Sequence, residues 1–557
     1  MCLRLPDLLK GADMKIYNER KFSGFREIVN YVADTFQNKT AFQIKVSEGV
    51  YEEISFERFR EHYYRLCTEF INRGFLGKKI AVSGANCYEW VLCYLAAATV
   101  GVAVPIDKEL SGEDIESFVS LCEGECIFCD NKVCDKLSID AVTFSSVREI
   151  VESDLVINKD AVDGIEKDKN EMSVLIFTSG TTGSSKGVML SQNNICANIF
   201  QTVSMVKILK SDKTMSILPL HHTYECTLDC LLILSRGATI CYTESLQTVA
   251  RNIKEYSPSI LVVVPELLAI LSRRIKAGII AGCPEKYKHL FENGSISEAL
   301  SKLPFIIRSV IKKKVKKTLG GKLRLFIVGA AELDVSIVDD FTALGIRTLQ
   351  GYGLTETSPL LAGNNDFYFN PRSTGVAIPF VKLKIDNPNE EGVGEILAQG
   401  ENIMLGYYNN QEATDEIMRG GWFHTGDLGK MDPDGALYIK GRIKNIIVSE
   451  NGKNIYPEEL ETRLSEYEEI GDVIVVSDKS SGRVQVKAKI FPNIDFLKSK
   501  FGHEPTSEEK LVTIKSVVEK VNSKIPTYKH IKMIEILSTS LEKTTTRKIK
   551  RFGSNVD

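Results

Sequence analysis

The chain has 557 residues, more than one hydrophobic core usually organises, so at least two domains are expected. Hydrophobic residues make up 43% and charged residues 26%, as in ordinary globular proteins that fold in water. The formal net charge of −3 gives no global indication of nucleic-acid binding, so no nucleic-acid partner is expected.

The start of the chain and its longest apolar stretch both favour a cytoplasmic protein. Met1 to Lys10 is short and mixed, because charged residues and a proline interrupt its apolar residues, which is not typical of a secretory signal. The longest apolar stretch, residues 91–106, is too short for a standard membrane span. We interpret this stretch as a buried helix that runs into a strand. Earlier in the chain, helical spacing over 56–73 predicts a helix, and Lys79–Ser83 reads as a strand.

A cluster of cysteines allows two interpretations. Four of the 13 cysteines lie close together, at Cys122, Cys126, Cys129 and Cys134. Such a cluster can hold zinc or an iron–sulfur centre, but only one CxxC pair is present. Residues 125–129 read instead as a short buried strand. We favour free thiols in a reducing compartment and keep the metal centre as the alternative.

A loop rich in glycine and hydroxyl residues lies between two apolar strands, 174–177 and 188–190. Its residues are Thr178, Ser179, Gly180, Thr181, Thr182, Gly183, Ser184, Ser185, Lys186 and Gly187. Glycines let backbone N–H groups approach an anion closely, and Lys186 adds a positive charge. The glycine spacing differs from that of the Walker loop, and a strand rather than a helix follows. The pattern predicts a phosphate-binding loop, with a polar hairpin tip as the alternative.

Two continuous apolar strands, 260–264 and 323–328, are typical of parallel sheets, so the alternation of helices and strands predicts an α/β architecture. Between them, residues 302–324 contain nine Lys or Arg and no acidic residue. Apolar residues at helical spacing predict a basic amphipathic helix there. We favour a helix with one face packed on the domain; the alternative is peripheral contact with an anionic membrane surface.

A domain boundary is predicted near Lys440 to Lys444, after a turn-rich run and a short strand at 436–439. Downstream, about 110 residues form a separate α+β pattern of the size of a small domain.

Five further runs follow the glycine-rich loop in a fixed order, and together they resemble the adenylate-forming superfamily. This superfamily includes acyl-CoA synthetases, firefly luciferase and peptide-synthetase adenylation domains, and the motifs look most like those of long-chain fatty acyl-CoA synthetases. The resemblance covers the chain from about Ile54 to Arg551. The runs are PLHHTYE (219–225), GYGLTET (351–357), GWFHTGDLG (421–429), GRIK (441–444) and KTTTRKIKR (543–551).

The resemblance implies a fold and an activity. It implies an N-terminal AMP-binding α/β domain with several subdomains (1–440), a hinge (441–445) and a small mobile α+β domain (446–557). It also implies a ligase that uses ATP and Mg²⁺ to convert a medium- to long-chain fatty acid to an acyl-adenylate and then transfers the acyl group to coenzyme A. Alternatives are an acyl carrier protein as acceptor, a ligase that stops at acyl-AMP, and a nucleotide-binding scaffold without catalysis.

By the same resemblance, Glu356 is the magnesium ligand and Thr355 lies near the α-phosphate. Lys548 contacts the substrate carboxylate and the α-phosphate, with Lys550 as the rival register because Arg547 stands where the motif commonly has glycine. His222 positions the acyl carboxylate; a buried structural histidine is the alternative.

The nucleotide pocket is implied in the same way. Tyr352, between Gly351 and Gly353, stacks on adenine, and the backbone of Gly329, Ala330 and Ala331 lines the adenine and acyl pockets. Asp427 accepts hydrogen bonds from the ribose hydroxyls and Arg442 also reaches the nucleotide.

For the second half-reaction, the resemblance implies rotation of the small domain at Lys444. This rotation brings Gly452 to the pantetheine tunnel of coenzyme A. Asn451 stands where many members have a second glycine.

Overall fold

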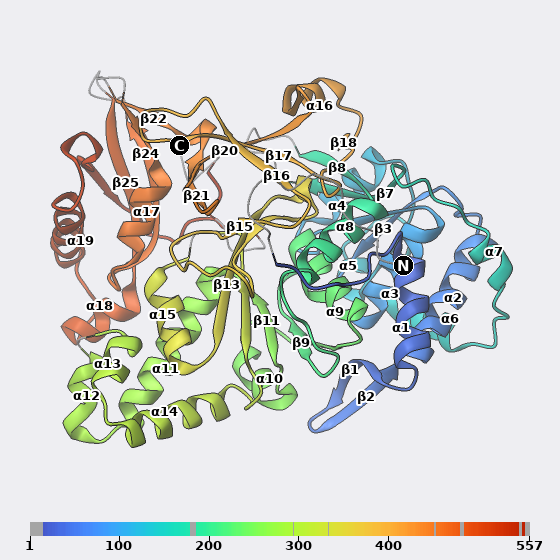
Figure 1. Cartoon of the computed structure of the whole chain (residues 1–557), viewed down its shortest axis with the longest axis horizontal. Helices are drawn as coiled ribbons and strands as arrows, with labels where there is room; N and C mark the ends of the chain where they lie inside the picture. Colours follow the sequence, from blue (N-terminus) through green and yellow to red (C-terminus); the bar gives the residue numbers. More distant parts are fainter. Residues whose placement is uncertain are drawn as a thin grey trace.

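The computed structural model describes residues 15–178, 185–292, 294–331, 333–449, 453–478, 484–544 and 549–551. These residues form a large α/β N-terminal domain with three sheets and a smaller α+β C-terminal domain, as predicted (Figure 1). A separate hydrophobic core begins at Ile447 and continues to Ile531 in the C-terminal domain. The position of the hinge between the two domains stays a prediction.

The first sheet has seven strands and carries the predicted glycine-rich loop at one edge. Its central strands are parallel and apolar, because α3 and other helices cover them, whereas β7, β8 and β18 pair antiparallel. In spatial order its strands are β18 (Gly406–Tyr407), β8 (Lys186–Ser191), β7 (Met172–Thr178), β4 (Val102–Ile106), β3 (Lys79–Ser83), β5 (Gly124–Cys129) and β6 (Ala141–Thr143).

The second sheet has nine strands, and the two apolar strands predicted from the sequence, β11 and β12, lie parallel at its centre. Its carboxyl-end loops carry residues of the nucleotide motifs. In spatial order its strands are β15 (Val376–Ala377), β14 (Leu360–Gly363), β13 (Arg347–Gly353), β12 (Leu325–Val328), β11 (Ile260–Val263), β9 (Lys213–Ser216), β10 (Thr239–Tyr242), β1 (Thr40–Ser47) and β2 (Val50–Ser55).

A third, antiparallel sheet leads into the C-terminal domain, which has a three-stranded sheet and a small two-stranded one. The third sheet contains β16 (Lys382–Asp386), β17 (Gly394–Gln399), β20 (Trp422–Met431), β19 (Met418–Arg419) and β21 (Leu437–Arg442). The C-terminal sheets contain β24 (Ile470–Asp478), β25 (Gln485–Pro492) and β26 (Met533–Ile536), and β22 (Ile447–Val448) with β23 (Asn454–Ile455).

The helix predicted at 56–73 is α2, and the buried helix predicted within residues 91–106 is α3, which runs directly into β4 as expected. α2 begins after Ser55, whose hydroxyl accepts a hydrogen bond from the Arg58 N–H. The α-helices of the N-terminal domain are α1 (Phe25–Phe36), α2 (Phe56–Asn72), α3 (Tyr88–Val100), α4 (Gly112–Leu121), α5 (Asn131–Cys134), α6 (Phe144–Glu152), α7 (Lys159–Asp163), α8 (Gln192–Val203), α9 (Leu232–Ser235), α10 (Val249–Tyr256), α11 (Pro265–Gly282), α12 (Glu285–Glu292), α13 (Ile296–Lys302), α14 (Phe305–Thr318), α15 (Val335–Leu344) and α16 (Gln411–Ile417).

Short helices of other types occur at the motifs, and three α-helices complete the C-terminal domain. A π-helix, η1 (Tyr224–Leu231), begins within the PLHHTYE run, and η2 (Thr355–Thr357) carries part of GYGLTET. The others are η3 (Ile443–Asn445), η4 (Thr527–Lys529), α17 (Pro457–Ser465), α18 (Ile494–Phe501) and α19 (Ser507–Asn522). The C-terminal domain lies at the left of Figure 1, above α12 and α13.

The cysteine cluster lies around β5, the short strand predicted there. Cys122 and Cys129 are buried, Cys126 and Cys134 are partly buried, and all four are free thiols. Burial raises the pKa of the Cys129 thiol to about 12, so this thiol is protonated and unreactive. Among the described residues, no group of three or more His, Cys, Asp or Glu side chains could hold a metal ion.

The basic segment forms α14, whose Ile311 and Val315 are buried against α11 and α15. The packed helix that the sequence favoured is therefore present. In the part of the chain that is described, every helix is too short or too polar to cross a bilayer.

Candidate active site

A cavity of about 2,050 Å³ lies between the N-terminal and C-terminal domains, and most of the predicted site residues line it. Residues of each motif contribute to the wall; GYGLTET and GRIK do so where β13 and β21 end, whereas GWFHTGDLG does so from within β20. The predicted residues on the wall are Thr178, Lys186, His222, Gly329, Ala330, Ala331, Gly351, Tyr352, Gly353, Thr355, Glu356, Asp427, Arg442 and Lys444.

Some predicted residues lie outside the described part of the chain: Ser179 to Gly183 in the glycine-rich loop, Gly452 and Lys548. The residues that flank the last two differ in position. Thr544 and Ile549, on either side of the segment with Lys548, line the cavity. Ser449 and Lys453, on either side of the segment with Gly452, are not among its described lining residues.

The two ends of the glycine-rich loop are held together by the sheet. β7 and β8 pair antiparallel so that Thr178 lies opposite Lys186, and the Thr178 hydroxyl donates to the Lys186 carbonyl oxygen at 3.3 Å. The paired base of the loop places Lys186 on the cavity wall.

Tyr407 connects two predicted phosphate-site residues that lie far apart in the sequence. Its hydroxyl donates to Glu356 Oε1 at 2.9 Å, and the Lys186 ammonium group lies 4.7 Å from the centroid of its ring. Burial and the nearby carboxylate of Glu356 raise the pKa of the Tyr407 hydroxyl, which therefore stays protonated and donates. A cation, an aromatic ring and a carboxylate thus form one continuous contact chain on the wall.

Gly353 explains why Glu356 is held at this place. A Cβ atom on Gly353 would lie 1.8 Å from the Pro359 carbonyl oxygen, so only glycine allows β13 and the segment after η2 to approach each other. The Thr357 N–H donates to the Leu354 carbonyl oxygen and closes the turn. The tight turn projects Glu356 into the cavity.

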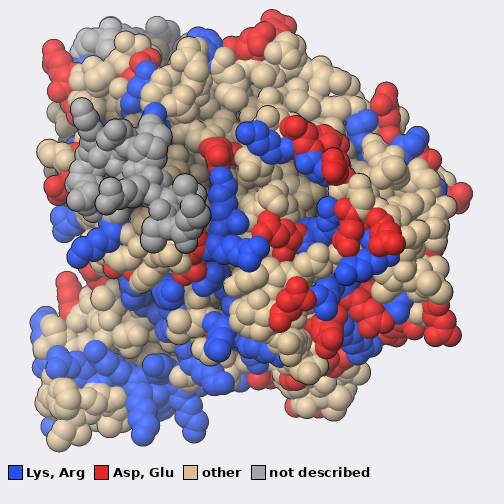
Figure 2. Space-filling view, turned by 45° about the vertical axis from the view of Figure 1, so that its right-hand side comes forward, with Lys and Arg blue, Asp and Glu red and all other residues tan. Residues whose placement is uncertain are grey.

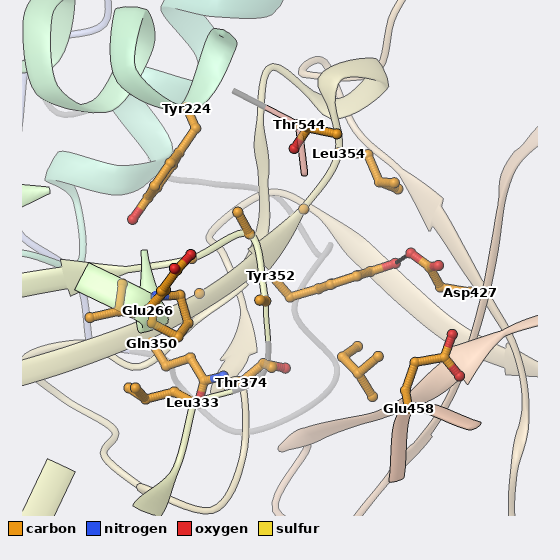
Figure 3. A pocket seen from close by; sticks show the side chains of 18 of the residues that line it. Tyr224, Glu266, Leu333, Gln350, Tyr352, Leu354, Thr374, Asp427, Glu458 and Thr544 are labelled. Atoms are coloured by element: carbon orange, nitrogen blue, oxygen red, sulfur yellow. Dashed lines mark hydrogen bonds between the residues drawn. The ribbon is translucent and has the colours of Figure 1, made fainter. Parts of the chain in front are cut away.

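Tyr352, Asp427 and Arg442 form a second polar group on the cavity wall. The Tyr352 hydroxyl donates to Asp427 Oδ2 at 2.7 Å, as Figure 3 shows, and Arg442 Nε lies 2.9 Å from Asp427 Oδ1. Residues 427 and 442 face each other across β20 and β21, so the sheet register fixes this pair. Each carboxylate oxygen has a second lone pair, which leaves Asp427 able to accept two more hydrogen bonds.

Charge and burial keep this group in defined protonation states. Burial, and then the Asp427 carboxylate, raise the pKa of the Tyr352 hydroxyl. Burial disfavours the Arg442 cation, but the nearby acidic groups, Asp427 foremost, together raise the pKa of the guanidinium group. Tyr352 therefore stays a neutral donor, and Arg442 stays positive.

A less polar part of the wall is built by the π-helix η1 and the two strands at the centre of the nine-stranded sheet. The Tyr224 hydroxyl donates to the carbonyl oxygens of Ile327 at 3.0 Å and Val263 at 3.2 Å. Its ring lies over Gly329, where a Cβ atom would come within 3.1 Å of Tyr224 Cζ. Glycine at 329 and the left-handed backbone of Ala330, with φ of 73°, therefore shape this part of the wall.

His222 lies on the wall next to His221, with 4.1 Å between the ring centroids. Burial, and then the neighbouring histidine, lower the pKa of His222 well below its ordinary value, while Asp107 acts in the opposite direction. Burial also lowers the pKa of His221, to about 3. Both rings are therefore neutral at pH 7, so His222 can donate or accept hydrogen bonds but carries no positive charge.

The C-terminal domain contacts the N-terminal domain beside the cavity. Lys543 Nζ lies 2.7 Å from Asp472 Oδ1 in its own domain and 3.2 Å from Glu266 Oε1 on α11. In Figure 3, Glu266, Thr544 and Glu458 are seen around the same pocket as Tyr352. This orientation brings the described ends of the KTTTRKIKR segment, 543–544 and 549–551, to the cavity wall.

Sequence reasoning gave no role to Tyr407, Lys543 or Glu266. Tyr407 lies in the two-residue strand β18 without charged neighbours in sequence, so no local pattern indicates that it contacts Glu356, 51 residues away. Lys543 lies in a predicted motif, but its partners come from two different domains. Only the three-dimensional arrangement reveals these contacts.

Comparisons with known proteins agree with this arrangement. The sequence model described as AMP-binding enzyme matches residues 29–408, and one described as AMP-binding enzyme C-terminal domain matches residues 444–552. The chain is 26% identical over 535 residues to long-chain-fatty-acid–CoA ligase FadD15 of Mycobacterium bovis, with 86% of this chain and 88% of that protein covered. It is 29% identical over 512 residues to long-chain-fatty-acid–CoA ligase 1 of Cavia porcellus, with 82% and 72% covered.

A solved structure shows the same fold. O-succinylbenzoate coenzyme A synthetase (MenE) of Bacillus subtilis, in complex with ATP and a magnesium ion, superposes with a TM-score of 0.72 at 18% identity. The superposition covers 94% of this chain and 98% of that chain.

Proposed function

This chain belongs to the AMP-binding enzyme family, and we propose on that premise that it is an AMP-forming ligase that joins a fatty acid to coenzyme A. In the first step, a carboxylate oxygen of the acid bonds to the α-phosphorus of ATP, and the bond to the leaving pyrophosphate breaks. In the second step, the thiol of coenzyme A takes the acyl group, losing its proton, and AMP leaves.

One observation carries the proposal: a single cavity is lined by Lys186 and Glu356, by the Asp427 carboxylate, and by a neutral, less polar part of the wall. The chain of contacts from Lys186 through Tyr407 to Glu356 would face the phosphates. Asp427, with two lone pairs left after its bonds to Tyr352 and Arg442, would accept the ribose hydroxyls. These groups bring two anionic reactants together and hold the reacting atoms in line.

The residues present fit a magnesium ion bound with ATP. Glu356 supplies a hard carboxylate oxygen on the cavity wall, beside the hydroxyl of Thr355, and such oxygens suit Mg²⁺. When bound with ATP, Mg²⁺ would neutralise developing negative charge on the phosphates. The chain's own contribution is to orient the Glu356 carboxylate, which the Tyr407 hydroxyl does from one side.

We propose that the acid is a medium- to long-chain fatty acid. This rests on the names of the two long-chain-fatty-acid–CoA ligases, which are similar along most of the chain.

The deciding experiment is a substrate panel from acetate to oleate, with ATP and Mg²⁺, and either coenzyme A or an acyl carrier protein as acceptor. Pyrophosphate release would report the first step and thioester formation the second. We expect long-chain acyl-CoA as the product. Thioester only with the carrier protein, release of acyl-AMP alone, or no pyrophosphate release with any acid would each contradict the proposal.

The matched variant is Glu356→Ala. It should lower pyrophosphate release by at least about a hundredfold, because a ligand of the ion that neutralises the phosphates is lost. Glu401→Ala, on an exposed turn 45 residues further on, is the control and should leave the rate unchanged. Near-normal turnover of Glu356→Ala at saturating Mg²⁺ would remove the metal assignment.

A further inference from the structure

Helix α14 carries an unusual excess of positive charge on the surface. Its five lysines lie between residues 312 and 317, and within the described residues none of them forms an ion pair with a carboxylate at 4.0 Å or less. Elsewhere on the molecule many surface lysines and arginines do have such partners. Figure 2 shows Lys and Arg gathered at the lower left, where Figure 1 places α12 and α14, with little acidic surface among them.

The same exposed side of α14 also presents large apolar side chains. Ile306 is 75% exposed, Phe305 72% and Val310 60%. Residues 306, 310, 313 and 317 follow one another at spacings of three or four, so they lie along one side of the helix. Ile306 and Val310 occupy its first half, and Lys313 and Lys317 occupy its second half.

The opposite side of α14 is fully used by the fold. Ile311 and Val315 are buried in the core that α11 and α15 share, and Leu319 closes the end of the helix. The exposed side is therefore a rigid, preformed surface rather than a segment that must first fold. Its apolar residues do not serve the core of this domain.

We propose that the exposed side of α14 binds an anionic lipid surface. Lysines attract the phosphate and carboxylate headgroups, while Ile306, Phe305 and Val310 enter the boundary between headgroups and acyl chains. A nucleic acid or an acidic protein would satisfy the charge, but it would not require three exposed apolar side chains beside the lysines. The combination of both on one preformed helix favours a membrane.

The position of α14 would bring a bound membrane close to the active-site cavity. α11, against which α14 packs, also lines the active-site cavity through Glu266, Ala269, Arg273 and Lys276. A membrane bound at α14 would lie next to the subdomain that forms one end of this cavity. If the proposed function holds, long-chain acids dissolved in that membrane are close to the site that uses them.

α19 in the C-terminal domain offers a matched control surface. It also exposes an apolar residue, Val512, and two lysines, Lys515 and Lys520. However, Glu508, Glu509 and Glu519 lie on the same helix and reduce its net charge. Charge reversal there changes the net charge of the protein as much as charge reversal on α14 does.

The test uses the full chain and flotation with vesicles of phosphatidylcholine, either alone or with roughly 30% phosphatidylserine, at about 50 mM and about 500 mM salt. Wild type should bind the anionic vesicles at low salt and much less at high salt. The variant Lys313→Glu with Lys317→Glu should bind at least tenfold more weakly, because each lysine near the surface contributes about fivefold. The variant Ile306→Ser with Val310→Ser should weaken binding at both salt concentrations, and Lys515→Glu with Lys520→Glu should match wild type.

Three results would overturn the proposal. These are no binding of wild type to the anionic vesicles, equal loss in the α19 control, or full binding after Ile306→Ser with Val310→Ser. The last would identify a general polyanion site, such as one for an acidic protein. Acyl-CoA formation in solution without vesicles is measured in parallel and should be unchanged in all variants. A failure of the proposed activity is thereby distinguished from a failure of the proposed membrane contact.

Discussion

At the scale of single residues, the site depends on side chains that hold other side chains in place. Tyr407 is the clearest case, because its hydroxyl binds Glu356 while its ring lies against the Lys186 ammonium group. A glutamate in a short 3₁₀ turn can adopt several rotamers, and only some direct it to a metal ion. The hydrogen bond from Tyr407 selects among them, as outer partners of metal ligands commonly do.

We therefore predict that Tyr407→Phe raises the Mg²⁺ concentration needed for half-maximal pyrophosphate release by about 10–100-fold, the usual effect of losing such a partner. The maximal rate at saturating Mg²⁺ should change less, because Glu356 itself remains. The measurement is a Mg²⁺ titration at fixed ATP. Tyr408→Phe is the control. The Lys79 ammonium group lies over the Tyr408 ring, and Tyr408 is not among the described residues that line the cavity. An unchanged Mg²⁺ requirement in Tyr407→Phe would show that Glu356 needs no such support.

Residue patterns predicted which groups meet in the site but not how they are joined. Asp427 and Arg442 belong to two separate motifs, and the register of β20 with β21 places them face to face. Sequence gives each motif a role only through its resemblance to a family. The bond between Tyr352 and Asp427 joins residues 75 apart, so no local spacing could have indicated it.

At the scale of elements, strands and buried helices were the easier part to predict. The continuous apolar runs at β11 and β12 and the buried helix α3 follow directly from hydrophobic pattern, because burial on both sides leaves no polar face. The π-helix η1 was not predicted, because a change from four- to five-residue hydrogen bonding has no plain signature in residue types. The exposed apolar side of α14 was equally hidden, since the sequence shows that apolar residues are present but not which of them the core uses.

The π-helix η1 contains two buried carboxyl groups that the proposed chemistry does not use. Glu225 accepts hydrogen bonds from the Ser216 hydroxyl at 2.6 Å and the Ile217 N–H at 3.0 Å, and Asp229 accepts one from the Thr214 hydroxyl. Burial and their mutual repulsion raise the pKa of Glu225, and burial raises the pKa of Asp229 well above its ordinary value of 3.8. One proton shared by the pair would avoid two negative charges in the interior.

This pair predicts a pH dependence of stability. A carboxyl group with a raised pKa holds its proton more firmly in the folded state than in the unfolded state. Its contribution to stability is therefore present at low pH and is lost as the pH rises above the ordinary aspartate range. Asp229→Asn keeps the shape of the side chain and stays neutral at every pH. From about pH 5 to about pH 8, the free energy of unfolding should therefore fall less in this variant than in wild type, and the difference between the two falls should be on the order of 1–3 kcal/mol. Thermal unfolding of both proteins at several pH values measures this difference. Parallel curves of unfolding free energy against pH would show that the pair does not share a proton.

At the scale of the whole molecule, two segments of the C-terminal domain are expected to serve one site in turn. Thr544 and Ile549, which flank Lys548, line the cavity in this structure, whereas the described residues that flank Gly452 do not. Lys543 joins Glu266 of the N-terminal domain to Asp472 of its own domain and so stabilises this orientation. Partly exposed ion pairs of this kind contribute about 1 kcal/mol or less, so the C-terminal domain can still move out of this orientation.

The orientation seen here is thus the one expected for acyl-adenylate formation, and we propose that the C-terminal domain rotates at Lys444 for thioester formation. Lys444 lies exposed in the 3₁₀ turn η3, between β21 and the separate core that starts at Ile447. Proline suits the backbone of such a turn, so Lys444→Pro should keep the present orientation and resist the rotation. Acyl-AMP formation should stay within about threefold of wild type, whereas thioester formation from supplied acyl-AMP should fall by at least tenfold.

Lys548→Ala should have the opposite effect, because it removes the cation proposed to contact the carboxylate and the α-phosphate during the first step but leaves the second orientation intact. The two half-reactions are measured separately in both variants, by pyrophosphate exchange for the first and by single-turnover thioester formation for the second. Lys550→Ala serves as the control for register, and it should retain the first half-reaction if Lys548 is the contacting residue. If both variants lose the two half-reactions equally, one fixed orientation serves both steps and the rotation at Lys444 is not needed.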